Sequence, residues 1–126
     1  MDVVSVDLET GEADVIKAGS PPTLVFRGDT VTVIGGSSLP VGALETASYS
    51  LDRRRLEAGD YIIMATDGVT DVLRDLPAAA AAALGPNVRK TAESILAAAE
   101  KAGPCRDDMS VLVVRIIPAE SAAQNG

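Results

Sequence analysis

The chain has 126 residues, of which 47% are hydrophobic, so it is long and apolar enough for one domain with its own core. Its formal net charge is −7, which argues against nucleic acid as a main partner, because phosphate backbones are bound by clustered Lys and Arg. Histidine is absent, which excludes a His-based triad and a His-ligated metal, so any metal site must use oxygen ligands and favours Mg²⁺ or Mn²⁺.

The first third of the sequence predicts two β-hairpins. Apolar and β-branched residues indicate strands over residues 3–8 and 13–16, with a turn at 9–12 between them. Residues 23–26 and 30–34 flank Arg27-Gly28-Asp29, which is typical of a hairpin with glycine in its loop.

The segment from Gly35 to Gly42 is rich in glycine but lacks the Gly-Lys-Ser/Thr ending of a phosphate-binding loop. Its composition favours a structural turn over a ligand cradle. Residues 49–51 and 61–66 predict two further strands, joined through residues 53–59. The arginines of this connection, Arg53, Arg54 and Arg55, are expected at the solvent-exposed surface, and so is Asp60, directly before the next strand.

After Thr66 the pattern changes to helix. Three helices are expected, over residues 70–76, 78–84 and 88–102. Pro77 opens the second, Asn87 caps the third, and Gly103-Pro104 stops it. Residues 110–117 form a last, apolar strand, so the order of elements predicts an α+β fold with an antiparallel sheet.

Carboxylates stand at two strand ends. Asp67 follows one buried-looking strand, and Asp107 and Asp108 precede another. Buried carboxylates are costly unless they are paired or bind a cation, so two such ends side by side would suit a hard cation. Gly68 would let the backbone turn sharply, so that Asp67 projects from the strand. Spacing alone leaves open a simpler alternative, an Asp-Gly turn and a solvated acidic loop.

The exact amino-acid sequences of these motifs are more specific than their spacing. The stretches "GDYIIMATDGVTDVL" and, about forty residues later, "RDDMSVLVVRI" resemble the metal-dependent protein phosphatase family. They look most like the branch named for stage II sporulation protein E. The segments "VDLETGEADVIKAGSPPTLVFRGDTV" and "SSLPVGAL" are similar to that branch as well, and the resemblance covers residues 2–117.

The resemblance implies a two-sheet antiparallel β-sandwich flanked by helices. It also implies hydrolysis of phosphoserine or phosphothreonine with two Mn²⁺ or Mg²⁺ ions. Asp67 and Asp107 match metal-binding aspartates of the family, and Gly68 matches the glycine whose backbone follows the first of them. Asp108 stands where many relatives have Asn, so it ranks second as a metal ligand.

The sequence departs from the family in one respect. Two earlier aspartate motifs, which family members carry in an N-terminal half, are missing. We therefore expect a partial sandwich in which residues 1–117 form the C-terminal part of a phosphatase domain and residues 118–126 a flexible tail. This chain alone is expected to be inactive. The alternative is a non-catalytic module of the same fold that binds a partner or self-associates.

Partners and location follow from the same reasoning. By resemblance, the parent protein would act on a phosphorylated regulator of the anti-sigma-factor-antagonist kind, in sporulation or stress signalling. Cys105 is the only cysteine, which fits a reducing cytoplasm. No membrane segment is visible in this chain, although the resemblance leaves a membrane anchor in the parent protein open. A divided sandwich would have open strand edges, so we expect a homo-oligomer or a groove for another half.

Overall fold

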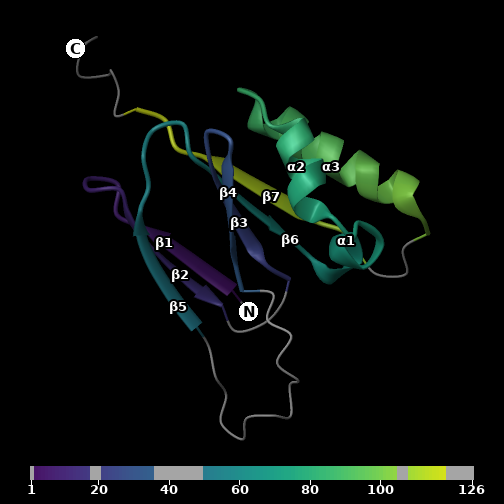
Figure 1. Ribbon diagram of the computed structural model, residues 1–126, viewed down its shortest axis with the longest axis horizontal. Helices are drawn as coiled ribbons and strands as arrows, with labels where there is room; N and C mark the ends of the chain where they lie inside the picture. Colours follow the sequence, from purple (N-terminus) through teal and green to yellow (C-terminus); the bar gives the residue numbers. More distant parts are fainter. Residues whose placement is uncertain (1, 18–20, 36–49, 105–107, 119–126) are drawn as a thin grey trace, which may run out of the picture.

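The computed structural model describes residues 2–17, 21–35, 50–104 and 108–118. The described residues form two antiparallel sheets and three helices (Figure 1). One sheet has three strands in the order β1-β2-β5, and the other has four in the order β4-β3-β6-β7. The expected α+β fold, a two-sheet antiparallel β-sandwich flanked by helices, is confirmed.

The strands, in chain order, are β1 (Asp2–Val6), β2 (Glu12–Lys17), β3 (Thr23–Arg27), β4 (Thr30–Ile34), β5 (Ser50–Arg55), β6 (Tyr61–Ala65) and β7 (Val111–Arg115). The helices are α1 (Asp67–Val72), α2 (Leu76–Ala83) and α3 (Val88–Ala102). None of these helices, in the part of the chain that the structure describes, combines the length and apolarity needed to cross a membrane. The predicted tail, apart from Pro118, lies outside the described residues, as does the glycine-rich segment after Gly35.

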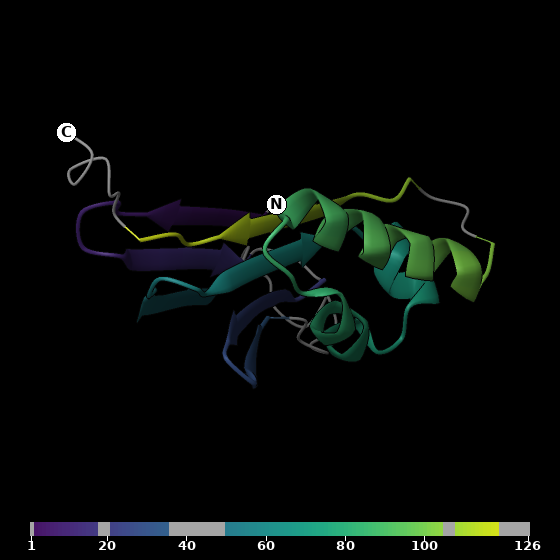
Figure 2. The same ribbon diagram turned by 90° about the horizontal axis from the view of Figure 1, so that it is seen from above.

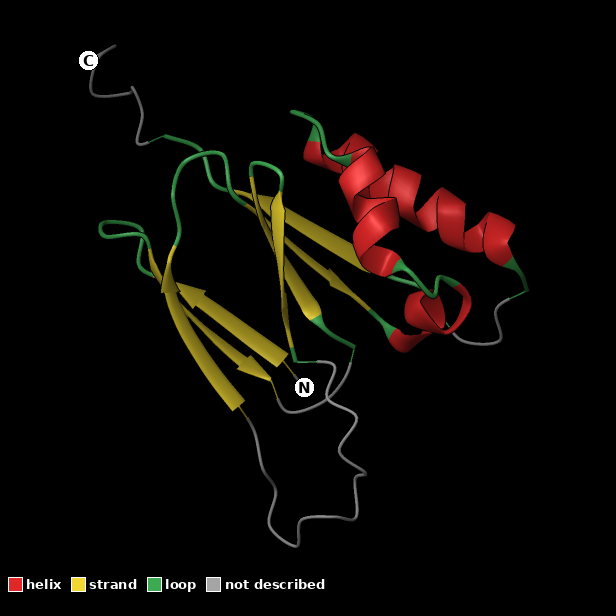
Figure 3. Ribbon diagram, viewed as in Figure 1, coloured by secondary structure: helices red, strands yellow, loops and turns green. Residues whose placement is uncertain are grey.

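The four-stranded sheet is the middle layer of the molecule. Figure 3 shows all three helices on the side of this sheet opposite the three-stranded sheet, and Figure 2 shows the same arrangement from above. Side chains of β3 and β6 alternate between two cores because successive residues of a strand point to opposite faces. The core under the helices contains Leu24, Phe26, Ile63, Val69, Leu76, Ala80, Ile95 and Ala99. The core between the sheets contains Ala13, Val15, Val25, Ile34, Leu56 and Ile62.

Helix α3 follows the sequence prediction closely. It spans the expected residues, and Asn87 caps it by accepting a hydrogen bond from the backbone N–H of Lys90 at 3.1 Å. Asp75 caps α2 in the same way through Ala78, at 3.1 Å. This cap explains why α2 begins at Leu76, slightly before the predicted start.

Several predicted boundaries are wrong. The strand expected to reach Leu8 ends at Val6, because the Asp7 carboxylate accepts hydrogen bonds from the backbone N–H groups of Glu9 and Thr10 and closes a turn. The helix expected over residues 70–76 begins at Asp67 and ends at Val72.

The third correction concerns the arginine cluster. Arg53, Arg54 and Arg55 lie inside β5 rather than in a connection, and they pair with β2. Arg53 faces Asp14 across the pair and binds it at 2.8 Å, which explains how a charged segment is accepted in a strand.

Candidate functional site

The β6–α1 corner is joined to the segment before β7 by a compact set of hydrogen bonds. The Thr66 N–H donates to the Ser110 carbonyl at 3.0 Å, and the Ser110 N–H donates to Thr66 Oγ1 at 2.9 Å. The Thr66 hydroxyl also lies 3.3 Å from the Asp108 carbonyl oxygen, a partner 42 residues away in the chain. The two segments that the sequence singled out therefore lie side by side, as predicted.

Asp67 and Asp108 are both exposed, in positions that leave their carboxylates open to solvent. Asp67 is the first residue of α1, directly after the corner residue Thr66. Asp108 precedes Met109 and Ser110, and its carbonyl is the one that Thr66 approaches. The third predicted ligand, Asp107, lies outside the described residues.

Gly68 has a different role in the backbone from the one expected. It is the second residue of α1 and is buried, and the glycines with positive φ are found elsewhere in the described chain. The corner is therefore made by the extended backbone of Thr66, with φ −85° and ψ 168°, and not by a glycine-specific turn. Buried Gly68 and Val69 anchor the start of α1 against the sheet.

The donor chemistry of this corner suits a hard cation, because carboxylate and carbonyl oxygens are the ligands that Mn²⁺ and Mg²⁺ prefer. The number of donors is small. Within the described residues, no group of three acidic or other metal-ligating side chains converges at one point. The oxygen ligands of this corner are therefore of the type that such an ion prefers, but the described residues alone supply too few of them to complete its coordination.

A buried carboxylate, held in an ion pair that the sequence did not predict, lies just before the start of β6. Asp60 was expected at the surface, but its side chain is only 2% exposed. Its carboxylate accepts hydrogen bonds from Arg27 Nη2 at 2.7 Å and from the Glu57 N–H at 2.8 Å. Burial raises the pKa of Asp60, but the Arg27 and Glu57 hydrogen bonds outweigh that effect and hold its pKa below the ordinary value.

A second buried charge, Lys17, lies at the end of β2. Only 4% of the residue is exposed, and its ammonium group donates to the Asp2 carboxylate, the Pro21 carbonyl and Thr23 Oγ1. A signal for its burial was present in the sequence, because the period of two along Ala13, Val15 and Lys17 puts all three on one face of the strand.

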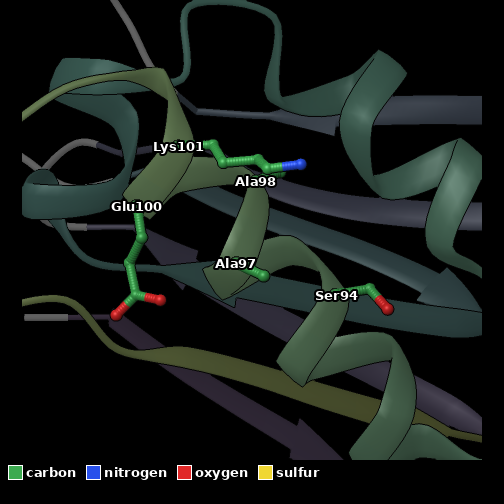
Figure 4. A pocket seen from close by; sticks show the side chains of 5 residues that line it. All are labelled: Ser94, Ala97, Ala98, Glu100 and Lys101. Carbon is green, nitrogen blue, oxygen red and sulfur yellow. The ribbon is translucent and has the colours of Figure 1, made fainter.

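Helix α3 also has a shallow hollow on its outer surface. Figure 4 shows its lining residues, all from this one helix: Ser94, Ala97, Ala98, Glu100 and Lys101. It holds a single carboxylate, and no residue of the β6–α1 corner lines it. The hollow is therefore not part of the candidate metal site.

Comparison with solved structures defines the class of fold. The phosphatase domain of the cell fate determinant SpoIIE from Bacillus subtilis aligns with a TM-score of 0.77 and 28% identity, over 95% of this chain and 56% of that chain. The catalytic domain of the serine/threonine protein phosphatase PstP, in complex with two manganese ions, aligns with a TM-score of 0.71 and 16% identity, over 92% of this chain and 57% of that one. The fold is thus that of PP2C-type phosphatase domains, of which this chain spans a little more than half.

The sequence comparisons identify the family within that class. Stage II sporulation protein E from Priestia megaterium is 35% identical over 69 residues, which are 55% of this chain and 12% of that protein. The family model described as stage II sporulation protein E (SpoIIE) matches residues 1–117. The chain belongs to the SpoIIE family.

Proposed function

We propose that this protein contributes the β6–α1 corner and the β7 segment of a metal-dependent phosphoserine/phosphothreonine protein phosphatase. In this proposal Asp67, Asp107 and Asp108 are metal ligands, and Gly68 is the residue whose backbone follows Asp67 in the site. The observation that carries the proposal is the hydrogen bonding of Thr66 to Ser110 and Asp108, which brings the two acidic segments together.

The bound ions, Mn²⁺ or Mg²⁺, would supply the positive charge that activates water and neutralises the phosphoryl oxygens. The manganese ions in PstP support this choice of metal. The chain's own part is to hold carboxylates at a fixed separation. The corner is suited to that task, because Thr66 is bonded through both its backbone and its hydroxyl group.

The substrate we propose is a phosphorylated regulatory protein of the anti-sigma-factor-antagonist kind, acting in sporulation or stress signalling in the cytoplasm. Membership of the SpoIIE family supports this choice. The chain spans 56% of the solved SpoIIE phosphatase domain, so turnover itself is proposed for the protein in which a complete domain is present.

The test is a Mn²⁺ titration followed by paramagnetic broadening of amide signals in the 126-residue chain. Broadening should be strongest at residues 66–69 and 108–110, with weak affinity, and Asp67→Ala should abolish it. Asp29→Ala is the matched control, because this exposed acid lies in the β3–β4 turn, at the end of the sheet opposite the corner. Unchanged broadening in Asp67→Ala would remove Asp67 from the site.

The alternative function, a non-catalytic module that binds a partner or self-associates, is favoured by one specific feature. Leu112 and Val114 pair with Met64 and Ile62 and share their face toward the space between the sheets, yet they are 56% and 38% exposed. β7 is also an edge strand, and such edges pair readily with other chains. A longer protein with a complete phosphatase domain that binds a partner protein but shows no Mn²⁺-dependent turnover would favour this alternative.

A further inference from the structure

Lys17 holds the two sheets together at one end of the sandwich. Its ammonium group has three N–H donors, and the structure supplies three acceptors: Asp2 at the start of β1, Pro21 before β3, and Thr23 at the start of β3. The Thr23 contact measures 3.1 Å. One buried side chain thus connects the three-stranded sheet to the four-stranded sheet.

This is the end of the sandwich at which the β6–α1 corner lies. Thr23 pairs with Met64 in the register of β3 and β6, so the Lys17 contact sits two residues before Thr66 along β6. The Arg27–Asp60 pair, in contrast, sits where β3 ends and β6 begins, at the opposite end.

The packing around the Lys17 side chain is tight. A Cβ atom placed on Gly35, at the end of β4, would lie 2.7 Å from Lys17 Cε, so glycine is needed there for the lysine stem to fit. Gly35 also has a φ of +81°, which favours glycine. The lysine is therefore bonded to residues of β1 and β3 and to Pro21, while Gly35, directly after β4, leaves room for its stem.

Stability alone does not account for a lysine at this position. Replacing a buried ion pair by apolar residues of similar volume is often neutral or stabilising, whereas a hydrogen-bonded charge specifies where its partners sit. Met, with a similar unbranched chain, would fill the same space. The feature that requires lysine is the fixed placement of the first residues of β1 and β3.

We propose that Lys17 is a positioning residue for the metal corner: through Thr23 and the β3–β6 pairing it fixes the end of β6, and hence Thr66 and Asp67. It touches no substrate or ion itself. The inference rests on the proposed function only where it concerns metal affinity; the effect on the corner's geometry is independent of it.

The experiment compares amide hydrogen exchange at the two ends of the sandwich in the full 126-residue chain. At the corner the reporters are the Thr66 and Ser110 N–H groups. At the opposite end they are the Gly59 N–H, which donates to the Ile116 carbonyl, and the Ile116 N–H, which donates to the Asp60 carbonyl. Lys17→Met should speed exchange at the corner pair by about tenfold and leave the opposite pair near the wild-type rate. Arg27→Met should give the reverse pattern.

A pair of variants with a smaller structural change keeps the test valid if Lys17→Met does not fold. Thr23→Val removes only the hydroxyl that Lys17 bonds, and Thr23→Ser retains it. The inference predicts faster corner exchange in Thr23→Val and restored protection in Thr23→Ser. Equal acceleration at both ends, or an unchanged corner in both Lys17→Met and Thr23→Val, would overturn it.

The metal readout separates this inference from the proposed function. Lys17→Met should weaken Mn²⁺-induced broadening at the corner by about tenfold in apparent affinity, the size expected when a group supporting metal ligands is lost. If the wild-type chain binds no Mn²⁺ but the exchange pattern holds, the proposed function fails and the positioning role stands. If Mn²⁺ binds and the corner exchanges alike in all variants, the positioning role fails.

Discussion

The buried Asp60–Arg27 pair gives a prediction whose size can be worked out from the structure. Asp60→Asn keeps the shape of the side chain but removes the charge that accepts bonds from Arg27 Nε, Arg27 Nη2 and the Glu57 N–H. Hydrogen bonds to charged groups contribute about 1.5–3 kcal/mol each. The Arg27 side chain is 50% exposed, so water screens the pair and compensates part of the loss.

We therefore expect Asp60→Asn to lower the free energy of unfolding by about 2–3 kcal/mol at pH 7. For a domain of this size, that lowers the melting temperature by about 10 °C. Urea unfolding followed by circular dichroism measures the change directly. Asp14→Asn is the matched control: Asp14 pairs with exposed Arg53 on the sandwich surface, so its loss should leave the unfolding midpoint near the wild-type value.

The pH dependence tests the same reasoning independently. The pKa of Asp60 is lowered in the folded state, so its contribution is present above the unfolded value of about 3.9 and is lost as pH falls through the lower folded-state pKa. The stability difference between wild type and Asp60→Asn should thus be full at pH 7 and shrink below about pH 4. A difference below about 0.5 kcal/mol at pH 7, or one that does not change with pH, would refute the argument.

Four further predictions follow from particular contacts. Asn87→Ala should lower the free energy of unfolding by about 1 kcal/mol in urea titrations, because it removes the cap on α3, whereas Asn87→Asp should be nearly neutral. Gly35→Ala should destabilise by about 1–2 kcal/mol through its positive φ and its clash with Lys17, and by more than Gly28→Ala, which has positive φ but open space around it. Sedimentation across a concentration series should show that the chain self-associates and that Val114→Lys reduces this self-association. A wild-type chain that stays monomeric at high concentration and binds no hydrophobic dye would show that the exposed side chains of β7 need no partner surface. The 126-residue chain should hydrolyse phosphoserine peptides negligibly with Mn²⁺, and robust turnover would mean that other residues complete the site.

Much of the fold was predictable because local signals agreed with the tertiary packing. In the β3–β4 hairpin, Gly28 marks the turn between two strand-like segments, and in α3, Asn87 marks the start of a segment with helical spacing of its apolar residues. The errors occurred where a side chain acted against the local pattern. Asp7 ended β1 early by bonding its own turn, and Asp14 made it possible for Arg53 to lie within β5. Such contacts depend on register, which the local sequence does not specify.

The candidate site was predictable only in part, and for a related reason. The motif sequences predicted Asp67, Asp107 and Asp108 as metal ligands, and the structure brings the segments of Asp67 and Asp108 together through Thr66. The two buried charges, Lys17 near the corner and Asp60 at the opposite end of β6, were missed, because a lysine at the end of a strand is usually exposed and Asp60 stands beside a turn glycine. The period of two along β2 does place Lys17 on the inner face, but the partners that satisfy the two charges, Asp2 and Arg27, lie 15 and 33 residues away in sequence, and no local pattern reports such pairs.

The distribution of charge among the described residues bears on the proposed cation site. Two buried charges are paired within the sandwich: Lys17 with Asp2, and Asp60 with the half-exposed Arg27. The remaining ion pairs between described residues use Arg27, Arg53 and Arg54, all with carboxylates other than Asp67 and Asp108. Within the described residues, the two corner carboxylates therefore have no basic side chain to neutralise them. Both carboxylates are exposed, so in the proposed site their oxygens would be open to a divalent cation, which prefers such ligands.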